Sequence, residues 1–149
     1  AVKAYLEVRG VFLKNGQPSP WLFPSRGAGG RLTPRRFAQR LDEAAMDRAC
    51  QCLIGQHDLM PFGWAPQGDN TVRNVLRAGV YRNGEQVIFE IVADAFLRRM
   101  VRRLAGNLIL VGLGRLSEDD FRGLLSLRSR RTPAVDAPPQ GLCLVQVNY

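Results

Sequence analysis

The chain has 149 residues, of which 46% are hydrophobic, and a formal net charge of +8 at pH 7. This length suits one ordinary domain with a real core. Because we find neither a signal peptide nor an apolar run long enough to cross a bilayer, we expect a cytoplasmic protein without membrane contact. The three cysteines and one histidine do not show the spacing of a metal-binding motif.

Most of the positive charge lies in the first quarter of the chain. Residues 1–41 contain eight lysines and arginines against Glu7 alone, a net charge of +7, whereas residues 42–149 contain thirteen against twelve acidic residues, a net charge of +1. We therefore predict a basic N-terminal arm over 1–41 and a separate domain over 42–149. The arm should begin with a short amphipathic helix at AVKAYLEVRGVFL, followed by loops and a second helix at LTPRRFAQRL with Thr33 as its N-cap.

Two elements follow the arm. LDEAAMDRACQCLIGQHD predicts a helix with Asp42 as N-cap, Leu41 and Met46 in contact across its first turn, and Gly55 at its end. TVRNVLRAGVYRNGEQVIFEIVA predicts two alternating strands around Asn83-Gly84, a pair that favours a type I′ hairpin turn.

A long helix is predicted over 94–112, DAFLRRMVRRLAGNLILVG. Its first half is amphipathic and its second half should be buried nearly all round. Four arginines lie together on its polar side, and something acidic should offset their charge. A solvated basic face is the ordinary interpretation of such a group. The arginines are Arg98, Arg99, Arg102 and Arg103.

The last elements are a helix at LSEDDFRGLLSL, capped by Ser117 with Asp120 at the reciprocal position, and a closing strand at GLCLVQVNY. This order of elements predicts an α+β domain in which helices pack on an antiparallel sheet.

Residues 41–149 resemble the C-terminal half of the TruA-type tRNA pseudouridine synthases. The likeness runs from LDEAAMDRACQCLIGQHDLMPF through the hairpin and FLRRMVRRLAG to APPQGLCLVQVNY, with the motifs in order. The resemblance implies isomerisation of uridine to pseudouridine in the tRNA anticodon arm, without a metal or organic cofactor, by a homodimer with a basic cleft for RNA. Cys143 departs from the tyrosine common in that family's GLYL motif.

The resemblance also implies roles for individual residues. The arginine that follows Met-Val keeps a catalytic carboxylate ionised in that family, and it matches Arg102 here. Leu142 matches the leucine that lines the pocket, with Met100 beside it. RNA phosphate contacts are expected from Arg98, Arg99, Arg103, Arg35 and Arg36.

The catalytic carboxylate itself is not found in this sequence. In the family it lies in a GRTDAGVHA-like loop, which no stretch here resembles. The chain therefore reads as an incomplete half that is inactive alone and needs a missing N-terminal half. If a local carboxylate replaces the catalytic one beside Arg102, the expected candidates are Glu90 and Asp94.

Residues 1–40 resemble a piece of the catalytic domain of Xer-type tyrosine recombinases around LFPSR and GGRLT, without that family's catalytic residues. A second hypothesis follows: a non-catalytic nucleic-acid-binding fusion protein, or a recombinase-derived fragment, whose basic arm contacts DNA or RNA.

Overall fold

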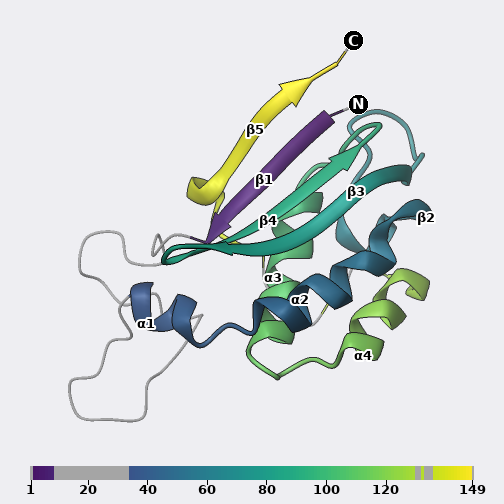
Figure 1. Cartoon of the computed structure of the whole chain (residues 1–149). Coiled ribbons are helices and arrows are strands. Elements are labelled where there is room, and N and C mark those ends of the chain that lie inside the picture. The colour runs from purple at the N-terminus through teal and green to yellow at the C-terminus, as the bar shows by residue number, and fades with distance from the viewer. Residues whose placement is uncertain (1, 9–33, 130–131, 133–135, 149) are drawn as a thin grey trace.

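The computed structural model describes residues 2–8, 34–129, 132 and 136–148. They form a five-stranded sheet in the order β2-β3-β4-β1-β5, with every neighbouring pair antiparallel. Helices α2 and α3 pack on one face of the sheet and α4 packs on these helices (Figure 1). The expected α+β class with an antiparallel sheet is confirmed. The strands are β1 (Val2–Val8), β2 (Gly55–Asp58), β3 (Val72–Asn83), β4 (Gln86–Ala93) and β5 (Leu142–Val147), and the helices are α1 (Pro34–Gln39), α2 (Glu43–Cys50), α3 (Met100–Gly112) and α4 (Glu118–Gly123).

Strand β1 corrects the first expected element. The helix predicted at 1–13 is wrong over residues 2–8, which lie between β4 and β5 in the sheet. Apolar Val, Ala, Leu and Val alternate here with Lys, Tyr and Glu, a period-two pattern that suits a strand, and over seven residues a helical pattern is easily confused with it. Residues 9–33 of the predicted arm, with the expected loops and the Thr33 cap, lie outside the described residues.

Strand β2 follows α2 in the chain. His57 and Asp58 belong to this short edge strand, which pairs with β3. The His57 ring lies 3.1 Å from the carbonyl oxygen of Ile54, and the Asp58 carboxylate accepts from the backbone N–H of Met60 at 3.1 Å. Both side chains are thus used in local hydrogen bonds.

The hairpin is confirmed, but its turn differs from the prediction by one residue. Asn83 pairs with Gln86, so the central turn residues are Gly84 and Glu85. Only Gly84 has a positive φ, of 58°. A positive φ at the first central residue alone is typical of a type II′ turn rather than type I′.

Two helices are capped by the residues that the sequence predicts. Asp42 accepts from the backbone N–H of Ala45 at 2.9 Å, and Ser117 accepts from the N–H of Asp120 at 3.0 Å. These bonds satisfy backbone donors that a helix leaves unpaired in its first turn.

The core lies between the helices and the sheet. The second half of α3 is buried on nearly all sides, as expected, and β4 contributes alternate residues to the same cluster. Gly112 is needed near the end of α3, because a Cβ there would lie 2.6 Å from the Sδ atom of buried Met46. The largest fully buried side chains include Phe62, Phe89, Phe121, Met46, Leu53, Leu104 and Leu108.

An ion pair connects α2 to the hairpin and makes stability depend on pH. The Glu43 carboxylate accepts from Arg82 at 2.7 Å, and this hydrogen bond lowers the pKa of Glu43 from 4.5 to about 2. A lowered pKa in the folded state adds stability above pH 4.5 that is lost as the pH falls towards 2. We expect the free energy of unfolding, measured by urea denaturation, to decrease across this window. Glu43→Gln should flatten that decrease, and an unchanged pH slope would contradict the assignment.

Candidate functional site

The start of α3 is set by a backbone contact with a distant loop. Arg98 donates its N–H to the carbonyl of Trp64 at 2.9 Å, and the N–H of Trp64 approaches the carbonyl of Arg98 at 3.4 Å. Gly63 permits this approach, since a Cβ there would lie 2.7 Å from the Arg98 carbonyl oxygen. The helix expected from residue 94 therefore begins at Met100, and its first six predicted residues are not helical.

Arg99 is the N-cap of α3 and adopts a left-handed conformation, with φ 68°. This conformation costs about 1 kcal/mol for a residue with a Cβ but almost nothing for glycine. We therefore expect Arg99→Gly to be more stable than Arg99→Ala by about 1 kcal/mol, as measured by thermal unfolding. Both variants lose the same side chain, so their difference isolates the backbone. Equal stabilities would show that the strain is absent.

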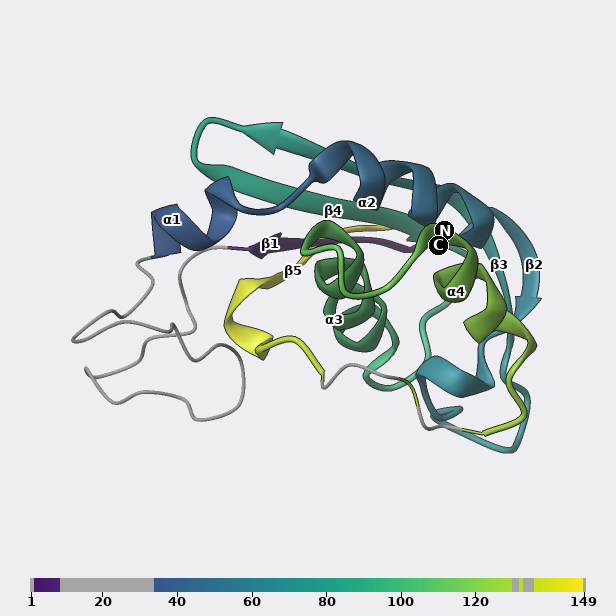
Figure 2. The same ribbon diagram turned by 90° about the horizontal axis from the view of Figure 1, so that it is seen from below.

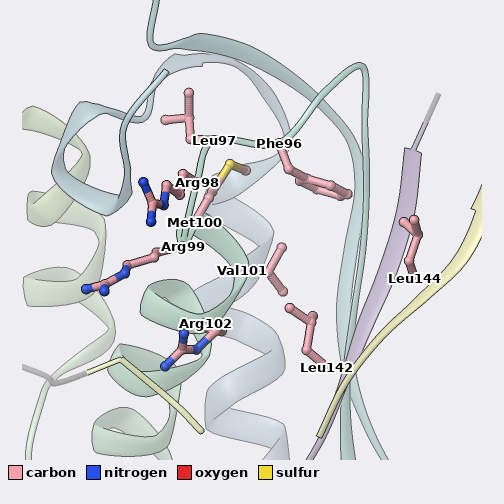
Figure 3. Close-up of a pocket in the computed structure, with 9 residues that line it drawn as sticks. All are labelled: Phe96, Leu97, Arg98, Arg99, Met100, Val101, Arg102, Leu142 and Leu144. Atoms are coloured by element: carbon pink, nitrogen blue, oxygen red, sulfur yellow. The ribbon is translucent and has the colours of Figure 1, made fainter. Parts of the chain in front are cut away.

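A pocket of about 420 Å³ opens between the start of α3 and β5. Its two sides differ in chemistry (Figure 3): three arginines lie on one side, while apolar side chains from the helix start and from β5 lie towards the strands. Such a pocket can accept a flat, partly apolar group that also carries negative charge. The lining residues are Phe96, Leu97, Arg98, Arg99, Met100, Val101, Arg102, Leu142 and Leu144.

Arg102 is fixed by reciprocal bonds to the segment that leads into β5. Its Nε donates to the carbonyl of Ala137 at 2.6 Å, and the N–H of Ala137 donates to the Arg102 carbonyl at 2.9 Å. Within the described part of the chain, no carboxylate forms an ion pair with Arg102. Arg102 is thus oriented at the pocket by main-chain contacts.

Asp136 is the acidic group that faces the arginine cluster. Its carboxylate lies 3.0 Å from Nε of Arg103 and 3.5 Å from Nη1 of Arg99. The Arg103 side chain is only 11% exposed and also lies 4.8 Å from the centre of the Trp64 ring. One carboxylate therefore offsets two of the four arginines and connects the segment before β5 to α3.

The carboxylates expected beside Arg102 are used elsewhere. Glu90 pairs with Arg77 on β3, and Asp94 accepts from the N–H groups of Asn74 and Ala95 at 3.0 and 2.7 Å. The expectation that either replaces a catalytic carboxylate is therefore wrong. Asp94 satisfies backbone donors where β4 ends, which its position in the sequence did not reveal.

The structure brings most of the expected site residues together. Arg98, Arg99, Met100, Arg102 and Leu142 all line the pocket. Arg103 is directed instead to Asp136 and the carbonyl of Pro61. Of the two arginines in α1, Arg36 is exposed, and the side chain of Arg35 lies outside the described residues.

Four lining residues were not expected from the sequence: Phe96, Leu97, Val101 and Leu144. Alternation along β5 could have identified Leu144, because it lies two residues after Leu142 and points to the same face. Phe96 lies before the first residue of α3 and packs partly against the core as well as lining the pocket.

One cysteine thiol is deeply buried, and no metal cluster is found in the described ranges. Burial raises the pKa of the Cys50 thiol to about 12, so this thiol is a poor nucleophile. In residues 2–8, 34–129, 132 and 136–148, no three His, Cys, Asp or Glu side chains come together as metal ligands. No helix within these ranges has the length and apolar character needed to cross a membrane.

Comparison with known proteins relates the sequence of this chain to one family. The profile of the family described as tRNA pseudouridine synthase matches residues 49–149. A tRNA pseudouridine synthase A from Roseiflexus castenholzii is 44% identical over 147 residues, covering 96% of this chain and 51% of the relative. One from Bartonella quintana is 39% identical over 170 aligned positions, covering 100% and 69%, and one from Coxiella burnetii is 42% identical over 110 residues, covering 73% and 42%.

These matches have two consequences for the interpretation of the chain. The chain spans 42% to 69% of the length of these three relatives. Two of the alignments cover nearly all of this chain, including most of its first forty residues. The resemblance of that segment to tyrosine recombinases finds no support in them.

Proposed function

The chain belongs to the tRNA pseudouridine synthase family, and we propose that it supplies the arginine-lined half of an active site that isomerises uridine in tRNA to pseudouridine. The observation that carries this proposal is the pocket. Arg102 and Leu142, forty residues apart, line one cavity together with Arg98, Arg99 and Met100. The resemblance to TruA-type enzymes assigns roles in the site to Arg102 and Leu142, and this supports the proposal.

Each side of the pocket has a role in the proposed chemistry. The apolar side, with Leu142, Leu144 and Phe96, would contact a uracil ring, while Arg98 and Arg99 would meet the phosphates of the flipped nucleotide. Arg102 would lie beside the catalytic carboxylate and keep it ionised, because a nearby positive charge favours the charged form of an acid.

The carboxylate would come from a segment that this sequence does not contain. No stretch of it resembles the GRTDAGVHA-like loop of the family, and the relatives are longer than this chain. We propose that a synthase N-terminal half provides this loop and completes the pocket. The terminal nitrogens of Arg102 would then face the incoming carboxylate while Nε remains bonded to Ala137.

Self-association and a role of the basic arm in nucleic-acid binding are further parts of the proposal. Strand β5 is exposed along its whole length, with Leu144 60% and Val145 47% exposed, and apolar surface of this kind favours association. The charge of residues 1–41 and the exposed Arg36 on α1 support contact with phosphate. If residues 1–41 act as such an arm, the part of it that forms β1 still belongs to the sheet.

The test is a pseudouridine assay on an unmodified tRNA transcript. The chain is assayed alone and together with the N-terminal half of the Roseiflexus castenholzii relative. We expect no pseudouridine from the chain alone and measurable formation from the mixture. The N-terminal half alone serves as the control and should be inactive.

Two outcomes would contradict the proposal. Activity of the purified chain alone would reject the incomplete-half interpretation. If the mixture is inactive and the chain binds tRNA no more tightly than duplex DNA, a non-catalytic nucleic-acid-binding role would be favoured instead.

A further inference from the structure

We propose that Trp64 forms a second nucleobase subsite beside the pocket, on which a base of the RNA next to the bound uridine stacks. This inference rests on the proposed function and extends it to a neighbouring nucleotide. Trp64 does not line the pocket itself. Its position, its exposure and the groups around it support the proposal.

The position of Trp64 is fixed relative to the pocket rim. Its backbone exchanges hydrogen bonds with Arg98, which lines the pocket. Gly63 allows the two segments to approach so closely that a Cβ would lie 2.7 Å from the Cβ of Leu97. Trp64 is therefore connected directly, through its backbone, to a residue that lines the pocket.

The indole is supported by arginines. The Arg103 guanidinium carbon lies 4.8 Å from the ring centre and that of Arg99 lies 5.9 Å from it. Arg103 is itself fixed by Asp136 at 3.0 Å. A ring that is already immobilised loses little conformational freedom when a ligand stacks on it, which favours binding.

The exposed part of the ring indicates what would cover it. Trp64 is 36% exposed, and the arginines next to it, Arg98 and Arg99, are exposed as well. An aromatic surface flanked by cationic side chains is typical of sites where bases stack and phosphates are neutralised, as in proteins that bind single-stranded RNA. A nucleotide carries both a base that can stack on the ring and a phosphate that the arginines can neutralise.

The experiment follows the fluorescence of Trp64 in the full chain. Because the sequence has two tryptophans, Trp21→Phe leaves Trp64 as the only reporter. The probes are a short oligouridylate and an abasic oligonucleotide of the same length and charge. We expect the oligouridylate to quench the fluorescence and to shield it from acrylamide, whereas the abasic probe should do neither. Equal responses to both probes would overturn the subsite.

Variants provide an independent measurement. Trp64→Leu should weaken oligouridylate binding by about 10- to 100-fold, the range expected for loss of one stacking platform, while Trp64→Phe should weaken it less. Tyr81→Leu removes another exposed aromatic, on β3, and should leave the affinity unchanged. If Trp64→Leu binds oligouridylate as tightly as the unaltered chain does, the inference is rejected. If the unaltered chain does not bind tRNA at all, the proposed function is rejected together with the inference.

Discussion

A proline at Ala4 should detach β5 from the sheet. Strand β1 lies between β4 and β5, with Ala4 opposite Ile91 and Leu144. The pairing with β5 shifts register between Lys3 and Ala4, but from Ala4 to Leu6 the strand is paired on both sides, and a proline there has no N–H to donate to either ladder. The variant loses the hydrogen bond of the residue 4 N–H and leaves the carbonyl that accepted it unpaired. Together these losses should lower the free energy of unfolding by about 3 kcal/mol.

The effect should be largest on β5, because β1 is its strand partner in the described sheet. Hydrogen exchange of the amides of residues 142–147 should become at least about 100-fold faster. Ala4→Gly retains the N–H and should cost only about 0.5 to 1 kcal/mol. If the amides of β5 in the proline variant remained as protected as in the unaltered chain, the position of β1 between β4 and β5 would be wrong.

Arg102→Gln should abolish most pseudouridine formation in the completed enzyme while leaving the fold intact. Glutamine can still donate to the Ala137 carbonyl, which Arg102 Nε reaches at 2.6 Å, but it carries no charge. Without that charge the catalytic carboxylate binds a proton more easily. We expect turnover near neutral pH to fall at least about 100-fold, as for loss of one preorganised electrostatic group.

The pH profile distinguishes this role from a structural one. Removal of the positive charge raises the pKa of the carboxylate, so the rising limb of the rate profile should move to higher pH in Arg102→Gln. Arg102→Lys retains the charge and should keep the limb near its original position. A profile with unchanged shape in Arg102→Gln would show that Arg102 does not act on the carboxylate.

Arg102→Leu tests what Arg102 contributes to stability, apart from any role in catalysis. From the sequence, this change is expected to leave stability unchanged or to raise it, since an unpartnered buried guanidinium is costly. The structure gives Arg102 a partner, and leucine would leave the buried carbonyl of Ala137 without this donor. The expected result is therefore a loss of about 1 to 3 kcal/mol, measured by urea denaturation.

Features with short-range causes could be predicted from the sequence. The caps at Asp42 and Ser117 depend on residues three positions away, and the hairpin depends on a glycine between two alternating runs. The buried half of α3 follows from its continuous apolar composition. Arg102 and Leu142 were proposed as neighbours only through resemblance, because spacing alone cannot relate residues so far apart.

Features with long-range causes could not be predicted. Strand β1 depends on partners at least 79 residues away in the chain, and over so short a segment its alternating pattern also fits an amphipathic helix. The late start of α3 depends on Gly63 and Trp64, whose effect on Arg98 no local propensity describes. No local pattern relates Asp136 to Arg99 and Arg103, with which its carboxylate pairs in the fold.

The pairing of β1 with β5 also determines the order in which this molecule can assemble. Residues 2–8 and 142–147 are adjacent in the sheet (Figure 2), although nearly the whole chain separates them. During synthesis the β3–β4 hairpin and the helices can form and β1 can pair with β4 while the ribosome still holds the last strand, but the other edge of β1 must wait for β5. Contacts of such long sequence separation form slowly because a large loop must close. The pocket wall formed by Leu142 and Leu144 is therefore the last part of the molecule to be completed, and a nascent chain that ends before Leu142 lacks that side of the pocket.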